Sequence, residues 1–179
     1  MRRPYIPPLC LLISVMIDIS VIPTLGIANI ETFMPPLFAA AVIALALLLG
    51  RTQGMLWGLL AGLLTDILVS DRVGFYSMVL VAIGYLAGFA GRNYDRYMSD
   101  KTTRFYRYYF MLRILAPFGC YLVYEFAKVA YLYLAGGRIY WALFGPVAIR
   151  AAACVMITQG YYLLCNRLMQ PHWARYARR

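Results

Sequence analysis

Long apolar stretches alternate with short polar connections along the whole chain. The apolar stretches cover residues 7–28, 33–50, 54–70, 74–91, 108–135 and 141–165. A helix needs about 20 residues to cross a bilayer, which is close to the length of each stretch. Because most of the connections are short turns, consecutive helices are expected to run antiparallel. The pattern predicts an all-α integral membrane protein, in which a six-helix transmembrane bundle forms a single domain over residues 1–179.

Composition supports this class and excludes others. Hydrophobic residues make up 63% of the chain and charged residues only 13%, so a soluble single-domain enzyme would lack the charge to cover its surface. The net charge of +10 comes from basic residues between apolar runs, which does not indicate a nucleic-acid interface. Arg2 and Arg3 precede the first stretch, as in a signal peptide, but no clean cleavage site follows. We therefore expect a retained first span.

The basic residues also predict an orientation. With the N-terminus in the cytoplasm, the inner segments hold Arg2, Arg3, Arg51, Arg92, Arg96, Lys101, Arg104, Arg107, Arg167, Arg175, Arg178 and Arg179, whereas the outer loops hold only Arg72 and Arg138. An excess of Lys and Arg marks cytoplasmic loops. Both termini are therefore expected inside, with a basic tail at 166–179.

One connection, residues 92–107, is longer and alternates basic residues with tyrosines. We expect an interfacial helix there, with Arg92, Arg96, Arg104 and Arg107 on anionic lipid phosphates. The same residues could instead form a docking surface for a cytoplasmic partner, and their spacing does not separate the two interpretations.

Four charges are predicted within the spans. Asp18 and Arg150 reach similar depths in the first and last spans, so we predict that they form an ion pair. Glu125 and Lys128 are three residues apart on one helix face and are expected to pair locally. A structural pin between helices explains such pairs, and a proton or ion relay is the functional alternative.

Small residues repeat along the third and fourth predicted spans. Glycines recur at four-residue spacing at Gly54, Gly58 and Gly62, and again at Gly84 and Gly88, followed by Gly91. Such stripes let helix backbones approach closely, either within the bundle or as a groove for a partner helix. Asp66 near the outer end of the third span could be reached by Arg72 or Lys128, and Gly74 opens the fourth span.

No pattern of catalytic, metal-binding or cofactor-binding residues emerges. Cys10, Cys120, Cys154 and Cys165 lie in apolar stretches without CxxC spacing, so we expect buried small hydrophobic residues there and neither a metal site nor a disulfide. The single histidine is His172 in the tail. Asp66 and Glu125 are the only acids at a depth suited to joint acid–base work. We therefore expect a non-enzymatic protein without metal or cofactor.

A set of motifs surrounds Asp66: Pro35 and Pro36 open the second span, GLLTDIL at residues 62–68 ends a glycine-rich stretch, and Gly74 and Tyr85 follow in the next span. This set resembles the MreD family of bacterial rod shape-determining proteins. The resemblance implies a scaffold subunit of the cell-elongation machinery in the cytoplasmic (inner) membrane. Its expected partner is MreC and, through MreC, MreB and the peptidoglycan polymerase and transpeptidase pair. By this analogy, the glycine-rich spans are candidates for contacting the MreC helix.

Two other classes share features with this pattern. The substrate-binding subunit of an energy-coupling-factor vitamin transporter has a similar size and six helices, and its architecture is thought to resemble that of MreD. However, such a subunit needs a polar, aromatic pocket closed by longer outer loops than this chain has. A lipid transporter would need a hydrated polar groove, which charges able to pair among themselves do not require.

Overall fold

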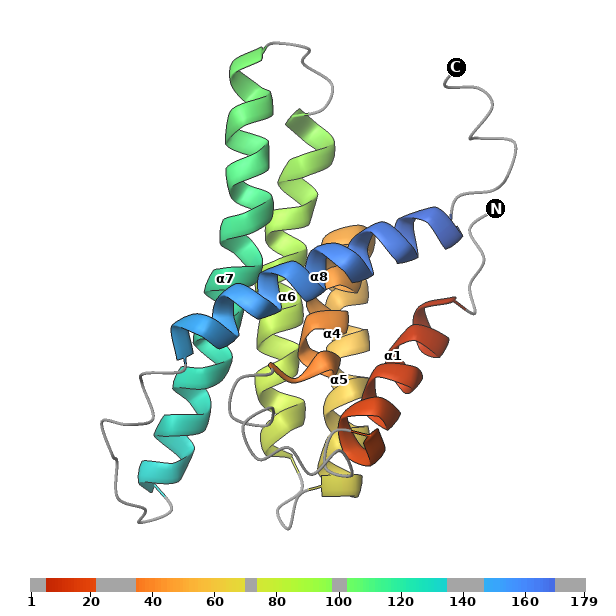
Figure 1. Ribbon diagram of the computed structural model, residues 1–179, viewed down its shortest axis with the longest axis vertical. Coiled ribbons are helices and arrows are strands. Elements are labelled where there is room, and N and C mark those ends of the chain that lie inside the picture. Colours follow the sequence, from red (N-terminus) through yellow and green to blue (C-terminus); the bar gives the residue numbers. More distant parts are fainter. Residues whose placement is uncertain (1–5, 22–34, 70–73, 98–102, 135–146, 170–179) are drawn as a thin grey trace.

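The computed structural model describes residues 6–21, 35–69, 74–97, 103–134 and 147–169, and the helices in it account for nearly all of them. There are six α-helices and one π-helical turn in this part of the chain (Figure 1): α1 (Ile6–Met16), η1 (Ile17–Val21), α4 (Leu37–Leu49), α5 (Arg51–Val69), α6 (Phe75–Tyr97), α7 (Thr103–Leu134) and α8 (Val147–Met169). The prediction of an all-α chain with six helices is confirmed over these residues.

Helix α4 is shorter than the predicted span of residues 33–50, and its ends explain why. It begins after Pro35 and Pro36, where proline fixes the backbone and disfavours helix at the residue before it. It ends at Gly50, whose φ of 87° lies in the left-handed region that favours glycine. Helix α5 begins at the next residue, so α4 and α5 form a tight hairpin.

Helix α4 forms the centre of the bundle. Every residue from Leu37 to Ala46 is buried, and the helix contacts α1, α5, α6, α7 and α8. Five of these ten residues are alanines, whose small side chains let neighbouring helices approach on all sides. A helix that is apolar around its whole circumference is expected at such a central position.

The surface of the bundle is apolar, whereas several polar side chains are buried. Ile67, Met78, Phe126 and Met156 are 71%, 80%, 75% and 74% exposed, on four different helices. Buried polar residues are Ser14, Thr65, Asp66, Ser77, Glu125 and Thr158. Large apolar patches on a soluble protein would promote association, so this distribution suits a lipid environment.

Length and composition distinguish one helix among those described. The stretch Val147–Leu168 is long and apolar enough to cross a membrane, and Pro8–Ser20, Leu37–Leu49 and Phe75–Gly91 are shorter apolar helices. In Figure 1, α8 runs obliquely across the bundle and does not lie parallel to α6 and α7. It contacts α1, α4 and α7.

The segment 92–107 differs from the predicted interfacial helix. Helix α6 continues to Tyr97 and α7 already begins at Thr103, so most of this segment prolongs two bundle helices. The ends of α6 and α7 extend beyond the other helices in Figure 1. The 32 residues of α7 correspond to about 48 Å, well above the roughly 30 Å of a hydrocarbon core. We call residues 92–97 and 103–107 the basic arm.

The two glycine stripes face each other across α5 and α6. A Cβ atom added at Gly54 would lie 2.5 Å from the carbonyl oxygen of Gly84, and one at Gly88 would lie 2.6 Å from Cα of Arg51. Added Cβ atoms at Gly58 and Gly62 would collide with the backbone of Leu80 and Ser77. The backbones of α5 and α6 are therefore in direct contact.

This contact corrects the prediction of a groove for a partner helix along Gly54, Gly58, Gly62, Gly84 and Gly88. Of the two interpretations of the stripe, close packing within the bundle is the one observed. Gly91 also packs directly against a neighbouring helix, because its added Cβ would lie 2.6 Å from the carbonyl oxygen of Leu47 on α4.

We predict that Gly58→Ala destabilises the protein, because a single methyl group forces the two helix backbones apart. Overpacking of this kind costs about 1–3 kcal/mol. Gly160→Ala on α8 is the matched control, since no atom lies within 4 Å of its added Cβ. The measurement is the thermal midpoint of the detergent-solubilised variants. Equal midpoints for the two variants would show that the α5–α6 contact is not tight.

Candidate functional site: polar groups inside the bundle

Asp66 lies at the end of α5 and caps the beginning of α6. Its two carboxylate oxygens accept hydrogen bonds from the backbone N–H groups of Tyr76 (3.1 Å) and Ser77 (3.0 Å), and the Ser77 hydroxyl donates a third bond at 2.5 Å. The side chain is fully buried. The first N–H groups of a helix have no partner within it, so the carboxylate supplies what α6 lacks.

Gly74 makes this geometry possible. Its φ of 113° is strained for any residue with a side chain, and the backbone turns there directly before α6. Among the described residues, Asp66 is therefore bonded to the start of α6. Arg72 lies outside the described residues, and the ammonium group of Lys128 lies 5.5 Å from the ring centre of Tyr124.

Asp18 has the same role at the start of α4. It lies in the π-helical turn η1, and its Oδ2 atom accepts a hydrogen bond of 2.8 Å from the backbone N–H of Phe38. The residue before α4 is Pro36, which makes no side-chain capping bond, so Asp18 supplies the acceptor. Its other oxygen, Oδ1, is buried without a hydrogen-bond partner.

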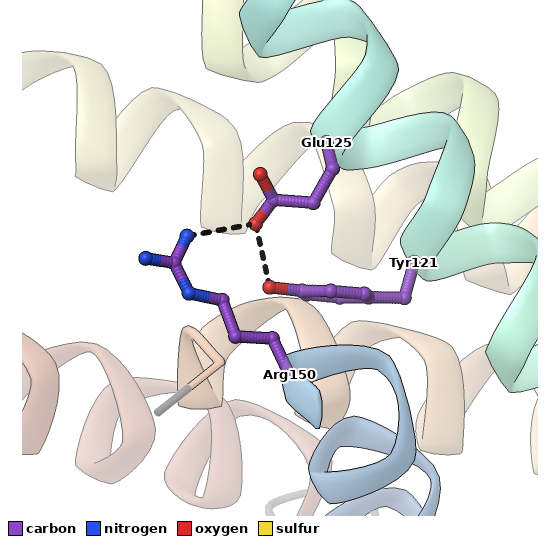
Figure 2. Close-up of polar contacts among 3 residues, drawn as sticks. All are labelled: Tyr121, Glu125 and Arg150. Atoms are coloured by element: carbon purple, nitrogen blue, oxygen red, sulfur yellow. Dashed lines mark hydrogen bonds and ion pairs between the residues drawn. The ribbon is translucent and has the colours of Figure 1, made fainter. Parts of the chain in front are cut away.

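Figure 2 shows a second polar cluster, in which Glu125 joins α7 to α8. The Tyr121 hydroxyl donates a hydrogen bond of 2.6 Å to Oε1 of Glu125, and the same oxygen lies 3.5 Å from Nη1 of Arg150. Tyr121 is fully buried and Glu125 is 7% exposed. One turn of α7 thus presents a hydroxyl and a carboxylate to an arginine of α8.

Both predicted charge pairs are wrong in their partners. Arg150 pairs with Glu125 and not with Asp18, because α7 packs beside α8, while Asp18 is held at the start of α4. Glu125 therefore does not pair with Lys128, whose ammonium group lies near the Tyr124 ring. Similar depth in two spans was not enough to identify neighbours.

Arg51, predicted from the sequence only as a cytoplasmic charge, contacts two aromatic rings of α6. The guanidinium carbon lies 4.1 Å from the ring centre of Phe89 and 5.8 Å from that of Tyr85, both on α6. Cation–π contacts of this type add about 0.5–2 kcal/mol. The absence of a side chain at Gly88, three residues from Tyr85 and adjacent to Phe89, lets the α5 backbone come this close.

The remaining predicted residues are only partly described. Arg92 and Arg96 lie one turn apart near the end of α6, and Arg104 and Arg107 lie in the first turns of α7, but their side chains are outside the described part of the chain, as is His172. Among the described residues, no group of three His, Cys, Asp or Glu side chains is placed to hold a metal ion.

The arrangement as a whole connects helices to one another. The carboxylate oxygens of Asp66 and Oε1 of Glu125, the acids considered for joint chemistry, are already bonded to backbone, hydroxyl or guanidinium groups. Asp66 joins α5 to α6, Asp18 joins η1 to α4, and Glu125 joins α7 to α8. Buried polar groups with satisfied partners fix the register of packed helices.

We predict that Glu125→Gln and Arg150→Gln each lower stability, because each removes one charge of the Glu125–Arg150 ion pair. Breaking a buried pair costs about 3–5 kcal/mol, whereas removing both charges is close to neutral. The double variant should therefore lose less stability than the sum of the losses in the two single variants. The measurement is thermal unfolding in detergent.

A second pair of variants serves as the control. Asp18→Asn combined with Arg150→Gln should give additive losses, because these residues are bonded to different helices. Coupling between Asp18 and Arg150, with none between Glu125 and Arg150, would contradict the observed pairing.

Comparison with known proteins assigns the family. The model of the family described as rod shape-determining protein MreD matches residues 3–133, which include α1, η1, α4, α5, α6 and nearly all of α7. No curated protein and no solved structure matches the chain. The family consists of membrane proteins with a role in rod-shape determination and is not known as enzymatic. The match covers well over half of the chain, and the protein therefore belongs to the MreD family of rod shape-determining proteins.

Proposed function

We propose that this protein is a non-enzymatic scaffold subunit of the bacterial cell-elongation complex, which binds the transmembrane helix of MreC. Through MreC it associates with MreB and with the peptidoglycan polymerase and transpeptidase pair. The observation that carries the proposal is the family match over residues 3–133. The apolar surface, with charges bonded inside the bundle, is consistent with a protein that acts through contacts within the membrane.

The proposal includes a topology with both termini in the cytoplasm. The basic residues of the chain support it, because they concentrate in the segments assigned to the inner side. The basic arm then also lies on the cytoplasmic side.

We place the MreC contact on the outer face of α5. Most motifs that resemble the MreD family lie in α5 and α6. The glycine stripes of these two helices pack against each other and are not available to a partner. Leu56, Leu59, Leu63 and Ile67 follow one side of α5 and are all exposed. The opposite side of α5 carries Gly54, Gly58 and Gly62 and packs against α6, so the exposed side is available to a partner helix.

We predict that a photoreactive amino acid at Leu59 captures MreC in native membranes. The matched control is Val123 on α7, because both side chains are 41% exposed and differ in the helix that carries them. Capture is measured by immunoblotting and mass spectrometry after irradiation, with the unmodified protein pulled down in parallel in mild detergent.

The possible outcomes distinguish the position of the MreC contact from the scaffold role itself. Capture from Val123 alone would move the MreC contact to α7 and leave the scaffold role intact. A pulldown without MreC would contradict the scaffold role, and recovery of an ATPase pair with a coupling subunit would indicate a vitamin transporter instead.

We further propose that the basic arm contacts anionic lipid headgroups through Arg92, Arg96, Arg104 and Arg107. The arm prolongs α6 and α7 beyond the apolar stretch Phe75–Gly91, and this position supports a location next to the headgroups. Arginine and tyrosine alternate in it, and this composition is typical of membrane interfaces.

Replacing these four arginines by glutamine should reduce the anionic lipid that copurifies with the protein. Each basic residue near an anionic surface contributes about 1 kcal/mol, so the four together predict a loss of more than tenfold. Lipid composition is measured by mass spectrometry of the detergent-purified protein. Replacement by lysine keeps the charge and is the control. Unchanged lipid in the glutamine variant would favour a cytoplasmic protein as the ligand of the arm.

A further inference from the structure

Two cysteines that are far apart in the sequence meet between the first and last described helices. The sulfur atoms of Cys10 on α1 and Cys165 on α8 lie 3.5 Å apart, although 155 positions separate them in the chain. Both are free thiols, Cys10 partly exposed and Cys165 only 1% exposed. Their spacing in the sequence gave no sign of this contact, because it arises from the crossing of two helices.

An adjacent polar contact holds the two helices in this position. The hydroxyl groups of Ser14 and Tyr161 are hydrogen-bonded at 2.8 Å, one helical turn away from the two cysteines on each helix. Ser14 also bonds to the carbonyl oxygen of Cys10 at 2.7 Å. In Figure 1 the beginning of α1 and the end of α8 lie on the same side of the bundle. The sulfur contact and the Ser14–Tyr161 bond therefore span one turn of each helix where α1 and α8 meet.

Within the described helices, the other two cysteines, Cys120 and Cys154, make no sulfur–sulfur contact of this kind. Cys154 makes its contact within its own helix, where its sulfur lies 3.8 Å from the hydroxyl oxygen of Thr158. Cys120 and Cys154 are both buried, and no sulfur contact between them is observed among the described residues. This second pair is therefore a matched control with the same chemistry in the same protein.

We propose that Cys10 and Cys165 form a dithiol site, which peroxides oxidise to a reversible intrachain disulfide between α1 and α8. A disulfide requires two sulfur atoms to approach to about 2.05 Å, so the sulfur atoms, now 3.5 Å apart, need to approach by about 1.5 Å. Reducing conditions in the cytoplasm keep such a pair as thiols, and oxidant closes it.

The oxidation balances in two steps. The sulfur of the more exposed Cys10 attacks one oxygen of hydrogen peroxide, the O–O bond breaks, and a sulfenic acid and one water molecule form. The Cys165 sulfur then attacks the sulfenic sulfur, the S–S bond forms and hydroxide leaves as a second water molecule, taking the thiol proton. The two thiols are oxidised, and the peroxide is reduced to two molecules of water.

The test uses the full-length protein, purified in reducing buffer and exposed to hydrogen peroxide. We expect its mass to fall by two hydrogen atoms and peptide mapping without reductant to show Cys10 linked to Cys165. Dithiothreitol should reverse both changes. The linked protein should also have a higher thermal midpoint, because the bond constrains a long loop in the unfolded chain.

Variants distinguish this site from general thiol oxidation. The double variant Cys120→Ser/Cys154→Ser should still form the link, whereas Cys10→Ser and Cys165→Ser should not. A link between Cys120 and Cys154, a link only between separate chains, or unmodified Cys10 and Cys165 in the oxidised wild-type protein would overturn the proposal. Peptide mapping of the wild type decides this even where a variant fails to fold.

Phenylarsine oxide provides a second readout that needs no oxidation. Its trivalent arsenic binds two neighbouring thiols with loss of one water molecule, so one arsenic group per chain is expected on the reduced protein. Cys10→Ser and Cys165→Ser should each abolish this addition. An arsenic group that remains in both single variants would place the dithiol elsewhere and contradict the assignment.

Discussion

The beginnings of helices inside an apolar bundle need hydrogen-bond acceptors, and in this protein carboxylates from other helical segments provide them. Asp66 at the end of α5 bonds to the first N–H groups of α6, and Asp18 in η1 bonds to the start of α4. An unsatisfied backbone group in a lipid environment costs several kcal/mol, so these caps are strong constraints on the fold. Each cap fixes the axial position of one helix relative to another. The close packing of the bundle depends on that position.

The α5–α6 pair shows how the cap and the packing work together. Glycines at 54, 58 and 62 on α5 meet the α6 backbone at Gly84, Leu80 and Ser77, and Ser77 is also the residue that bonds to Asp66. A slip of one residue along the axis would place side chains against backbone and break the cap. Gly74 allows the turn that brings Asp66 to α6. The acid and the glycines, separate features in the sequence, therefore specify one register.

The sequence predicts the helices, but it does not predict which helices pack against one another. The six helices followed from the apolar runs, because every long run corresponds to a helix in the described residues. The glycine stripes were recognised as close-packing surfaces, but four-residue spacing alone does not say which helix fills them. Asp18 and Arg150 lie at similar depths in their helices, which predicts a pair, but depth does not define the position of a residue around the bundle axis. The oblique course of α8 places Arg150 beside Glu125. The meeting of Cys10 with Cys165 depends on the same crossing.

Helix α8 is attached by contacts of a different kind from those that join α5 to α6. Added Cβ atoms at Gly160 would meet no neighbour, so a glycine contact does not set the position of α8 there. Polar groups act at two points along α8: Arg150 pairs with Glu125 of α7, and Tyr161 bonds to Ser14 of α1. Directional contacts at two points set both the tilt and the rotation of a helix, whereas apolar packing alone allows it to slide. The course of α8 across the bundle therefore depends on these two polar contacts together with its packing against the central helix α4.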